Sequence, residues 1–296
     1  MGAWGAGLYS NDLALDLKAM IGAVVRLPFE PARLLQLLCE TEFGASTDPD
    51  EATTFWLVVA DQFAKRGVDL PEARERALAI IAEGVDLKAM ESLGMPPKEL
   101  EKRQRMLLEL RQRLIAPVAP ATRKTMTAPQ KLLMQSGDVL AFPSSQGRPI
   151  NPYLASKKEM RPQFQQDGWG VFVVVECGLV FDFLAWYRPL VIEIALPQRP
   201  ALADLEAPRT WYLNRAGVCS PAHYKRMELA PIGRVVIDAA KFEAAFPDRP
   251  APRSDTISDI SISNRLQMID PEKADIQRRG RARWRRVDSL AQIASA

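Results

Sequence analysis

Residues 169–196 read WGVFVVVECGLVFDFLAWYRPLVIEIAL, and this stretch decides the fold of the second half of the chain. It is dense in Val, Ile, Phe, Trp and Tyr, the residue types that favour strands. We expect a turn at Cys177-Gly178 and a break before a third strand at Arg188-Pro189. The stretch therefore predicts consecutive strands of an antiparallel sheet.

Outward from this stretch, further segments carry strand signals. Residues 133–143, LMQSGDVLAFP, predict a strand closed by Pro143, and residues 210–215, 234–238 and 256–263 are three more candidate strands. Residues 221–229, PAHYKRMEL, predict a short helix between them. We expect residues 132–270 to form an antiparallel β-rich domain, a sandwich or an open barrel.

The first 115 residues have a helical pattern instead. Prolines at the first helical position predict helix starts at Pro31, Pro49 and Pro71 and after Pro96, and Asp48 would cap the second of these. Glycines predict helix ends at three positions, which are Gly67, Gly84 and Gly94. In the last helix the spacing places one group of leucines on a single apolar side, Leu100, Leu107, Leu110 and Leu114. The chain is therefore predicted to be α+β, with a helical domain at residues 1–115.

Charge divides the chain further. Residues 1–97 hold 8 Lys/Arg and 15 Asp/Glu, a net charge of −7, whereas residues 98–131 hold 9 and 3, a net of +6. Residues 116–131, with three prolines and no apolar period, predict a basic linker. Residues 271–296 form a basic tail. The overall net charge of +3 hides these changes of sign.

Composition narrows the class of protein. Hydrophobic residues make up 47%, enough for a core, and no run of about 18 apolar residues predicts a membrane span. The three cysteines are scattered and odd in number, which is typical of unpaired thiols in a reducing cytoplasm. The first residues lack the basic start and apolar run of a signal peptide. We expect a cytoplasmic protein without contact to a membrane.

Residues that could carry catalysis are few. The chain has one histidine, His223, and Cys219-x-x-x-His223 is its only pairing with a cysteine. A metal site needs further ligands at suitable spacing, and no phosphate-binding or dinucleotide-binding motif occurs. We therefore expect no catalytic residue, no metal and no cofactor. The alternative, an enzyme of unrecognised type, requires a cleft in which acids converge near His223.

The basic tail has the strongest local charge signal. Six arginines and a tryptophan could bind phosphates and stack on a base. The alternatives are a solvated end without a role and a contact to an acidic protein. The candidate nucleic-acid contacts are Arg278, Arg279, Arg281, Arg283, Trp284, Arg285 and Arg286.

Two segments carry a resemblance to known families. Residues 1–16, MGAWGAGLYSNDLALD, resemble the start of a bacterial family of unknown function that opens Met-Gly-x-Trp-Gly-x-Gly and continues through Asn-Asp into a helix. The matching residues include Trp4, Gly5, Gly7, Asn11 and Asp12, and the resemblance continues to Trp56 in a Phe-Trp-Leu core. By analogy with that family we expect Trp4 to pack against the helical domain.

The second resemblance lies after the linker. Residues 137–149, GDVLAFPSSQGRP, are similar to the first hairpin of immunity-protein families of bacterial toxin systems, through Gly137, Asp138, Pro143 and Gly147. The resemblance implies a non-enzymatic binding protein that neutralises a toxin. The acidic first block would suit a basic toxin, because opposite charge speeds capture. The alternative function is nucleic-acid association through the basic connector and the arginine-rich tail.

Overall fold

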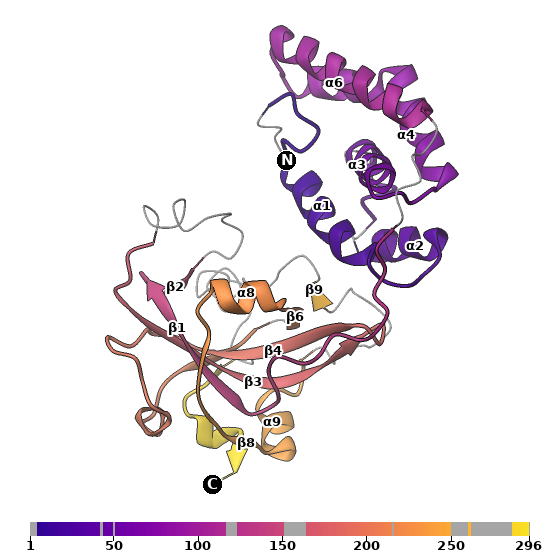
Figure 1. Cartoon of the computed structure of the whole chain (residues 1–296). Helices are drawn as coiled ribbons and strands as arrows, with labels where there is room; N and C mark the ends of the chain where they lie inside the picture. The colour runs from indigo at the N-terminus through magenta and orange to yellow at the C-terminus, as the bar shows by residue number, and fades with distance from the viewer. Residues whose placement is uncertain are drawn as a thin grey trace. The chain divides into compact units, whose positions relative to one another are not determined.

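The computed structural model describes residues 5–41, 44–49, 51–116, 123–150, 164–214, 216–249, 260–261 and 286–295. It divides into two compact units, Met1–Ala128 and Pro129–Ala296. Figure 1 shows helices in the first unit and a sheet with short helices in the second. Each unit has its own core, so each is described by itself.

The helical unit begins with α1 (Asp12–Val24) and α2 (Pro31–Thr41). The Asn11 side chain accepts a hydrogen bond from the Ala14 backbone N–H at 2.7 Å, so Asn11 is the N-cap of α1. The apolar positions at helical spacing in α1 are buried. Proline at the first position of α2 agrees with the predicted start.

The next helix, α3 (Ala52–Lys65), is the centre of this unit and contacts α1, α4, α5 and α6. Every residue from Thr54 to Phe63 is buried. The predicted start at Asp48-Pro49 is wrong by about one turn, because residues 44–47 form a turn that ends at Asp48. The Asp48 carbonyl accepts the Ala52 N–H at 2.8 Å.

Three helices complete the unit: α4 (Pro71–Glu83), α5 (Val85–Ser92) and α6 (Pro97–Ile115). Gly84 and Gly94 adopt φ values of 66° and 82° where α4 and α5 end, the left-handed conformation that favours glycine. In α6 the buried stripe consists of Leu107, Leu110, Leu114 and one charged residue, Arg103. Leu100, predicted for this stripe, is only half-buried.

The described part of the predicted linker is tied down by hydrogen bonds within each unit. The Arg123 guanidinium donates to the backbone carbonyls of Val25 and Phe29 at 2.8 Å each, and also to that of Leu27. In the second unit, the Gln130 N–H donates to the Phe183 carbonyl at 2.9 Å. The change of unit between residues 128 and 129 lies inside the segment predicted to be the linker.

The second unit is built on one sheet whose strands are hydrogen-bonded in the order β10-β5-β4-β3-β1-β2. Three further strands join it: β7 pairs with β1, β6 with β4, and β9 with β6, the last in parallel. The strand bounds are β1 (Asp138–Ser145), β2 (Arg148–Pro149), β3 (Gly168–Val180), β4 (Leu184–Ile192), β5 (Trp211–Leu213), β6 (Ala216–Val218), β7 (Ala230–Arg234), β9 (Ile260–Ser261) and β10 (Arg286–Val287). A separate pair joins β8 (Val236–Ile237) to β11 (Ala294–Ser295).

Several expectations about these strands are wrong. Pro143 does not close its strand, because β1 continues to Ser145, and residues 234–238 are divided between β7 and β8. No turn forms at Cys177-Gly178, because β3 continues to Val180 and the chain reverses at Phe181 and Asp182, both at positive φ. No break forms at Arg188-Pro189, because β4 passes through them. Pro189 fits there since its carbonyl accepts the Asn214 N–H at 3.0 Å and the pairing with β3 is irregular beside it.

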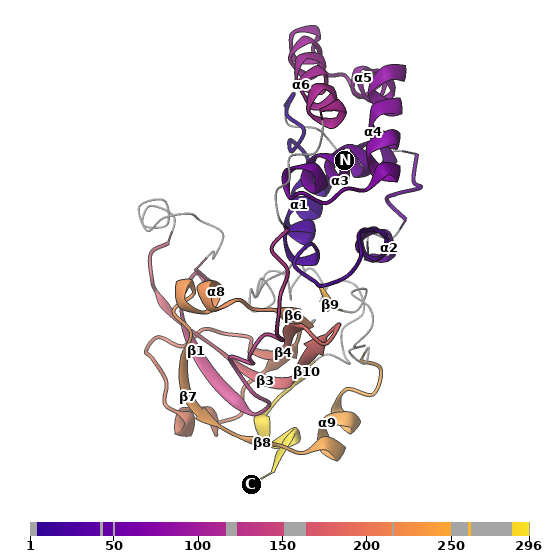
Figure 2. The same cartoon turned by 45° about the vertical axis from the view of Figure 1, so that its right-hand side comes forward.

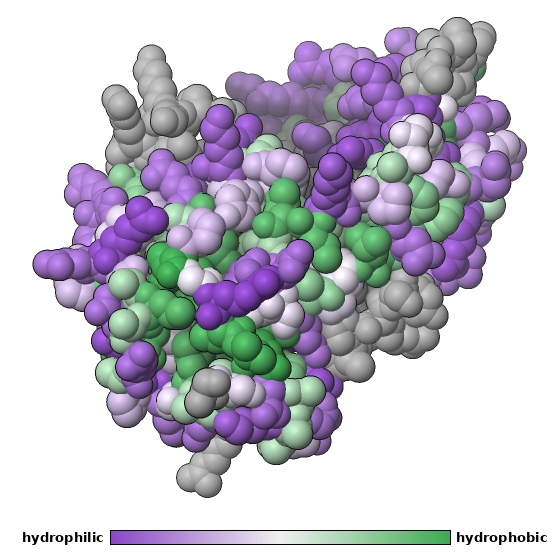
Figure 3. Space-filling model, turned by 60° about the horizontal axis from the view of Figure 1, so that its bottom comes forward, coloured by the Kyte–Doolittle hydropathy of each residue, from purple (hydrophilic) through white to green (hydrophobic). Residues whose placement is uncertain are grey.

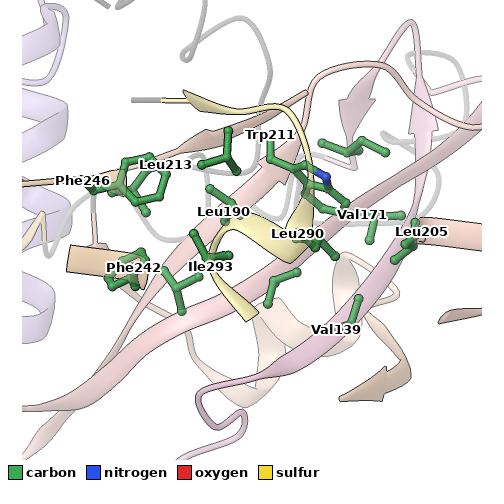
Figure 4. Close-up of a cluster of buried hydrophobic side chains, with 14 of the residues drawn as sticks. Val139, Val171, Leu190, Leu205, Trp211, Leu213, Phe242, Phe246, Leu290 and Ile293 are labelled. Carbon is green, nitrogen blue, oxygen red and sulfur yellow. The ribbon is translucent and has the colours of Figure 1, made fainter. Parts of the chain in front are cut away.

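Both faces of the sheet are buried, since alternate residues of β3 enter two different cores. One core packs Val171 and Val173 against helix α9 (Ala239–Ala245) and the 3-10 turn η4 (Leu290–Gln292), as Figure 4 shows for Trp211 and the residues around it. The other packs Phe172 and Val174 with residues that flank α8 (Pro221–Arg226). In Figure 2, α8 and α9 lie on opposite sides of the sheet.

The predicted fold class is confirmed: the chain is α+β, helical first and then an antiparallel sheet. The sheet is not closed into a barrel. The short helix predicted within residues 221–229 is α8. Helix α9 and the short 3-10 turn η1 (Leu202–Leu205) had no sequence prediction.

Candidate functional site

The sole cysteine–histidine pairing in the sequence lies at α8. Cys219 is buried, and burial raises the pKa of its thiol to about 12. His223 is buried in the first turn of α8, where the Ser220 hydroxyl accepts its backbone N–H at 3.2 Å. Burial also raises the pKa values of Cys39 and Cys177. These thiols are therefore protonated at neutral pH and are weak nucleophiles.

Groups that could hold a metal are absent from the described residues, where no three His, Cys, Asp or Glu side chains come together. None of the helices in the described part of the chain is both long and apolar enough to cross a bilayer.

The glycine-rich arm, the first of the two segments with a family resemblance, is fixed onto the helical unit by its backbone. The Gly7 carbonyl accepts a hydrogen bond from Arg103 Nη1 at 3.2 Å. A Cβ at Gly7 would lie 2.9 Å from Ser10 Oγ, a contact that rotation of this hydroxyl can relieve. Asn11 caps α1, and Asp12 is exposed in its first turn. Trp4 lies outside the described residues.

A buried ion pair lies beneath this arm. Arg103 of α6 binds Asp86 of α5 with both ends of its guanidinium, Nε to Oδ1 at 2.5 Å and Nη2 to Oδ2 at 2.8 Å. The side chains are 1% and 0% exposed. Because Arg103 also holds the Gly7 carbonyl, one residue joins the arm, α5 and α6.

A second polar cluster surrounds Asp61 of α3. Its carboxylate accepts hydrogen bonds from Lys65 Nζ at 2.6 Å, from Arg113 Nη2 at 2.8 Å and from the Tyr9 hydroxyl. Burial alone would raise the pKa of Asp61, but the hydrogen bonds from Lys65, Tyr9 and Arg113 outweigh it and lower that pKa. Burial and the Asp61 carboxylate raise the pKa of Tyr9. The carboxylate is therefore charged and fully satisfied.

A pocket of about 260 Å³ opens beside this cluster, between α3, α4 and α6. Its apolar walls include Phe63, Val68, Leu110 and Leu114, and its polar rim includes Asp61 with its two cations. Sequence reasoning did not find this pocket, because the residues that form it come from three helices and match no motif.

Trp56, which belongs to the first resemblance, packs inside the helical unit. Its ring is buried in α3, and its indole N–H donates to the Ser46 carbonyl at 3.1 Å. The Arg76 guanidinium lies 4.3 Å from the ring centroid. Trp56 thus holds the turn before α3 and part of α4 in place.

Gly137 and Asp138, part of the second resemblance, form a joint between strands. Gly137 has φ of 89°, and a Cβ there would lie 2.1 Å from the Val235 carbonyl oxygen. Asp138 accepts the Gln135 N–H at 2.7 Å and pairs with Arg234 at 3.0 Å. The hairpin turn that follows lies at Gln146-Gly147.

Of the predicted nucleic-acid contacts only Arg286 is described; the others, Arg278, Arg279, Arg281, Arg283, Trp284 and Arg285, lie outside the described residues. Arg286 is exposed and pairs with Tyr212 across β10 and β5.

Apolar residues also reach the surface of the sheet unit. Ile194 is 72% and Val236 67% exposed. On the face shown in Figure 3, apolar residues gather between hydrophilic side chains. A second pocket, also of about 260 Å³, lies beside Ile194 and is lined by Glu193 and Arg209 among others.

No protein-family model, curated protein or solved structure matches this chain.

Proposed function

We propose that this chain is a non-enzymatic binding protein of a bacterial conflict system, one that neutralises a basic toxin by capturing it on the helical unit. The observation that carries the proposal is an acidic ridge on α4, defined as Glu72, Glu75 and Glu83, of which Glu72 is paired with Arg76 at 3.2 Å. Their spacing places them on one face of the helix, and all three are exposed.

The remaining chemistry of the chain supports binding over catalysis. The side chains that could act as nucleophile or base, Cys219 and His223, are buried in the packing of α8, and the thiol is protonated. The buried carboxylates Asp61 and Asp86 are held by cations. An inhibitor of this kind needs only a complementary surface, and charge complementarity accelerates its encounter with the toxin.

The test asks whether a gene beside this chain's gene encodes a basic nuclease toxin domain, and measures the inhibition of that domain. The purified full-length chain should block its cleavage of plasmid DNA or RNA at equimolar concentration. Reversing the ridge, with Glu75→Lys and Glu83→Lys together, should slow association about 10-fold at low salt. The matched control is Glu206→Lys with Glu228→Lys, two exposed acids of the sheet unit. Equal effects of the two double variants would contradict the ridge as the contact surface.

A second function is favoured by the exposed face of α6, which carries Lys98, Lys102 and Arg105 at intervals of four and three residues. Phosphates can bind to this face, and separately to the arginine-rich tail of the second unit. Filter binding to DNA and RNA at low and moderate salt tests it. Removing residues 278–286 should flatten the salt dependence by up to about six phosphate contacts. Absence of binding at low salt would exclude nucleic-acid association.

A further inference from the structure

The pocket between α3, α4 and α6 combines an apolar interior with a mouth rich in hydrogen-bond donors. Phe63 and Leu110 line its walls, while Lys65 and Arg113 stand at the mouth with side chains 48% and 47% exposed. The apolar walls favour an aliphatic or aromatic group.

Donors outnumber acceptors at this mouth. Asp61 is already satisfied, since it accepts from both cations and from Tyr9. Lys65 and Arg113 each give Asp61 one hydrogen bond, although an ammonium has three donors and a guanidinium five. Three cations, Lys65, Arg74 and Arg113, and two carboxylates, Asp61 and Asp69, line the pocket. Asp69 is paired with Arg74 at 2.9 Å, so the lining keeps one excess positive charge that complements an anionic ligand.

The volume indicates what kind of ligand carries that charge. About 260 Å³ lies below the ~300–1,000 Å³ of pockets that enclose drug-sized molecules, and it suits an anchoring side chain of a larger partner. We infer that the pocket binds a peptide segment of a partner protein in which an apolar side chain stands beside a carboxylate. This inference rests on the proposed function, because the proposed function is what makes the partner a protein.

Two independent parts of the binding can be tested with short peptides. Acetyl-Leu-Leu-Asp with a free carboxyl terminus is titrated into the full-length chain, and the amide resonances of Ala64, Val68 and Leu110 are followed by NMR. These resonances should shift in a saturable manner. Acetyl-Leu-Leu-Asn-amide should bind at least about 10-fold more weakly because it lacks the charge. Acetyl-Ser-Ser-Asp should not bind because it lacks the apolar anchor.

The protein variant fills the pocket and keeps every residue of the Asp61 cluster unchanged. Ala64→Leu places a larger side chain at a half-buried lining position and should weaken peptide binding at least about 10-fold. Ala79→Leu, an exposed position on α4 outside the pocket, is the matched control and should bind normally. Circular dichroism confirms that both variants are folded.

Several results would overturn the inference: equal binding of the charged and amidated peptides, no effect of Ala64→Leu, or displacement of the peptide by decanoate at lower concentration, which would assign the pocket to a small ligand. If no peptide binds while the toxin is still inhibited, the pocket inference fails and the proposed function stands. If the peptide binds but no toxin is inhibited, the pocket inference stands and the proposed function fails.

Discussion

Breaking the buried ion pair between Arg103 and Asp86 should destabilise the helical unit more than any exposed charge change. Both side chains are almost fully buried and joined by hydrogen bonds of 2.5 and 2.8 Å. Asp86→Ala or Arg103→Met leaves a buried charge without its partner, which costs about 3–5 kcal/mol. Arg103→Met should be the worse of the two by about 1 kcal/mol, because it also releases the Gly7 carbonyl.

The double variant distinguishes this reasoning from simple loss of packing. With both charges removed, its free energy of unfolding should fall by no more than that of the worse single variant, so the coupling energy is about 3 kcal/mol. Urea unfolding followed by circular dichroism at 222 nm measures all four proteins. The reasoning would be refuted if each single variant lowered the free energy of unfolding by less than about 1 kcal/mol. It would also be refuted if the loss in the double variant equalled the sum of the two single losses.

Three further predictions concern single residues. The pKa of Asp61 is lowered in the folded state, so its charge stabilises the fold above its ordinary pKa of about 4, and this stabilisation is lost as pH falls through the folded pKa. The difference in free energy of unfolding between the native chain and Asp61→Asn should therefore be largest at pH 7 and smaller at pH 3. A difference independent of pH would contradict this. Gly137→Ala should lower the free energy of unfolding by about 3 kcal/mol, because the position has a positive φ and a Cβ there clashes with the Val235 carbonyl. Gly94→Ala, which has a positive φ but open space around it, should cost about 1 kcal/mol. Equal losses for the two variants in thermal or urea unfolding would show that the clash is relieved. Cys219 should resist iodoacetamide at pH 8 until the protein unfolds, as read by mass spectrometry, and rapid labelling in the folded state would show an accessible thiolate.

Local signals predicted the helices well and the strand ends poorly. Proline at a first helical position fixes φ within one residue, so the starts at Pro31, Pro71 and Pro97 could be predicted from the sequence. The continuation of β3 and β4 through Gly178 and Pro189 depends on pairing with distant strands, which local propensity does not contain.

The candidate site was beyond sequence reasoning for the same reason. Asp61 gathers Tyr9 and Arg113, each 52 residues away along the chain. One signal was present for the ion pair: Arg103 falls on the helical stripe of Leu107 and Leu114, so a charge at that position needed a buried partner. The sequence pattern does not identify Asp86 as that partner.

The most direct test of the proposed function has two parts: whether a gene beside this chain's gene encodes a basic nuclease toxin domain, and whether the purified full-length chain inhibits the nuclease activity of that domain. Stoichiometric inhibition, with association slowed by reversal of Glu75 and Glu83 but not of Glu206 and Glu228, is the predicted result. Undiminished cleavage at a molar excess of this chain, or a gene neighbourhood that encodes no toxin, would contradict the proposal.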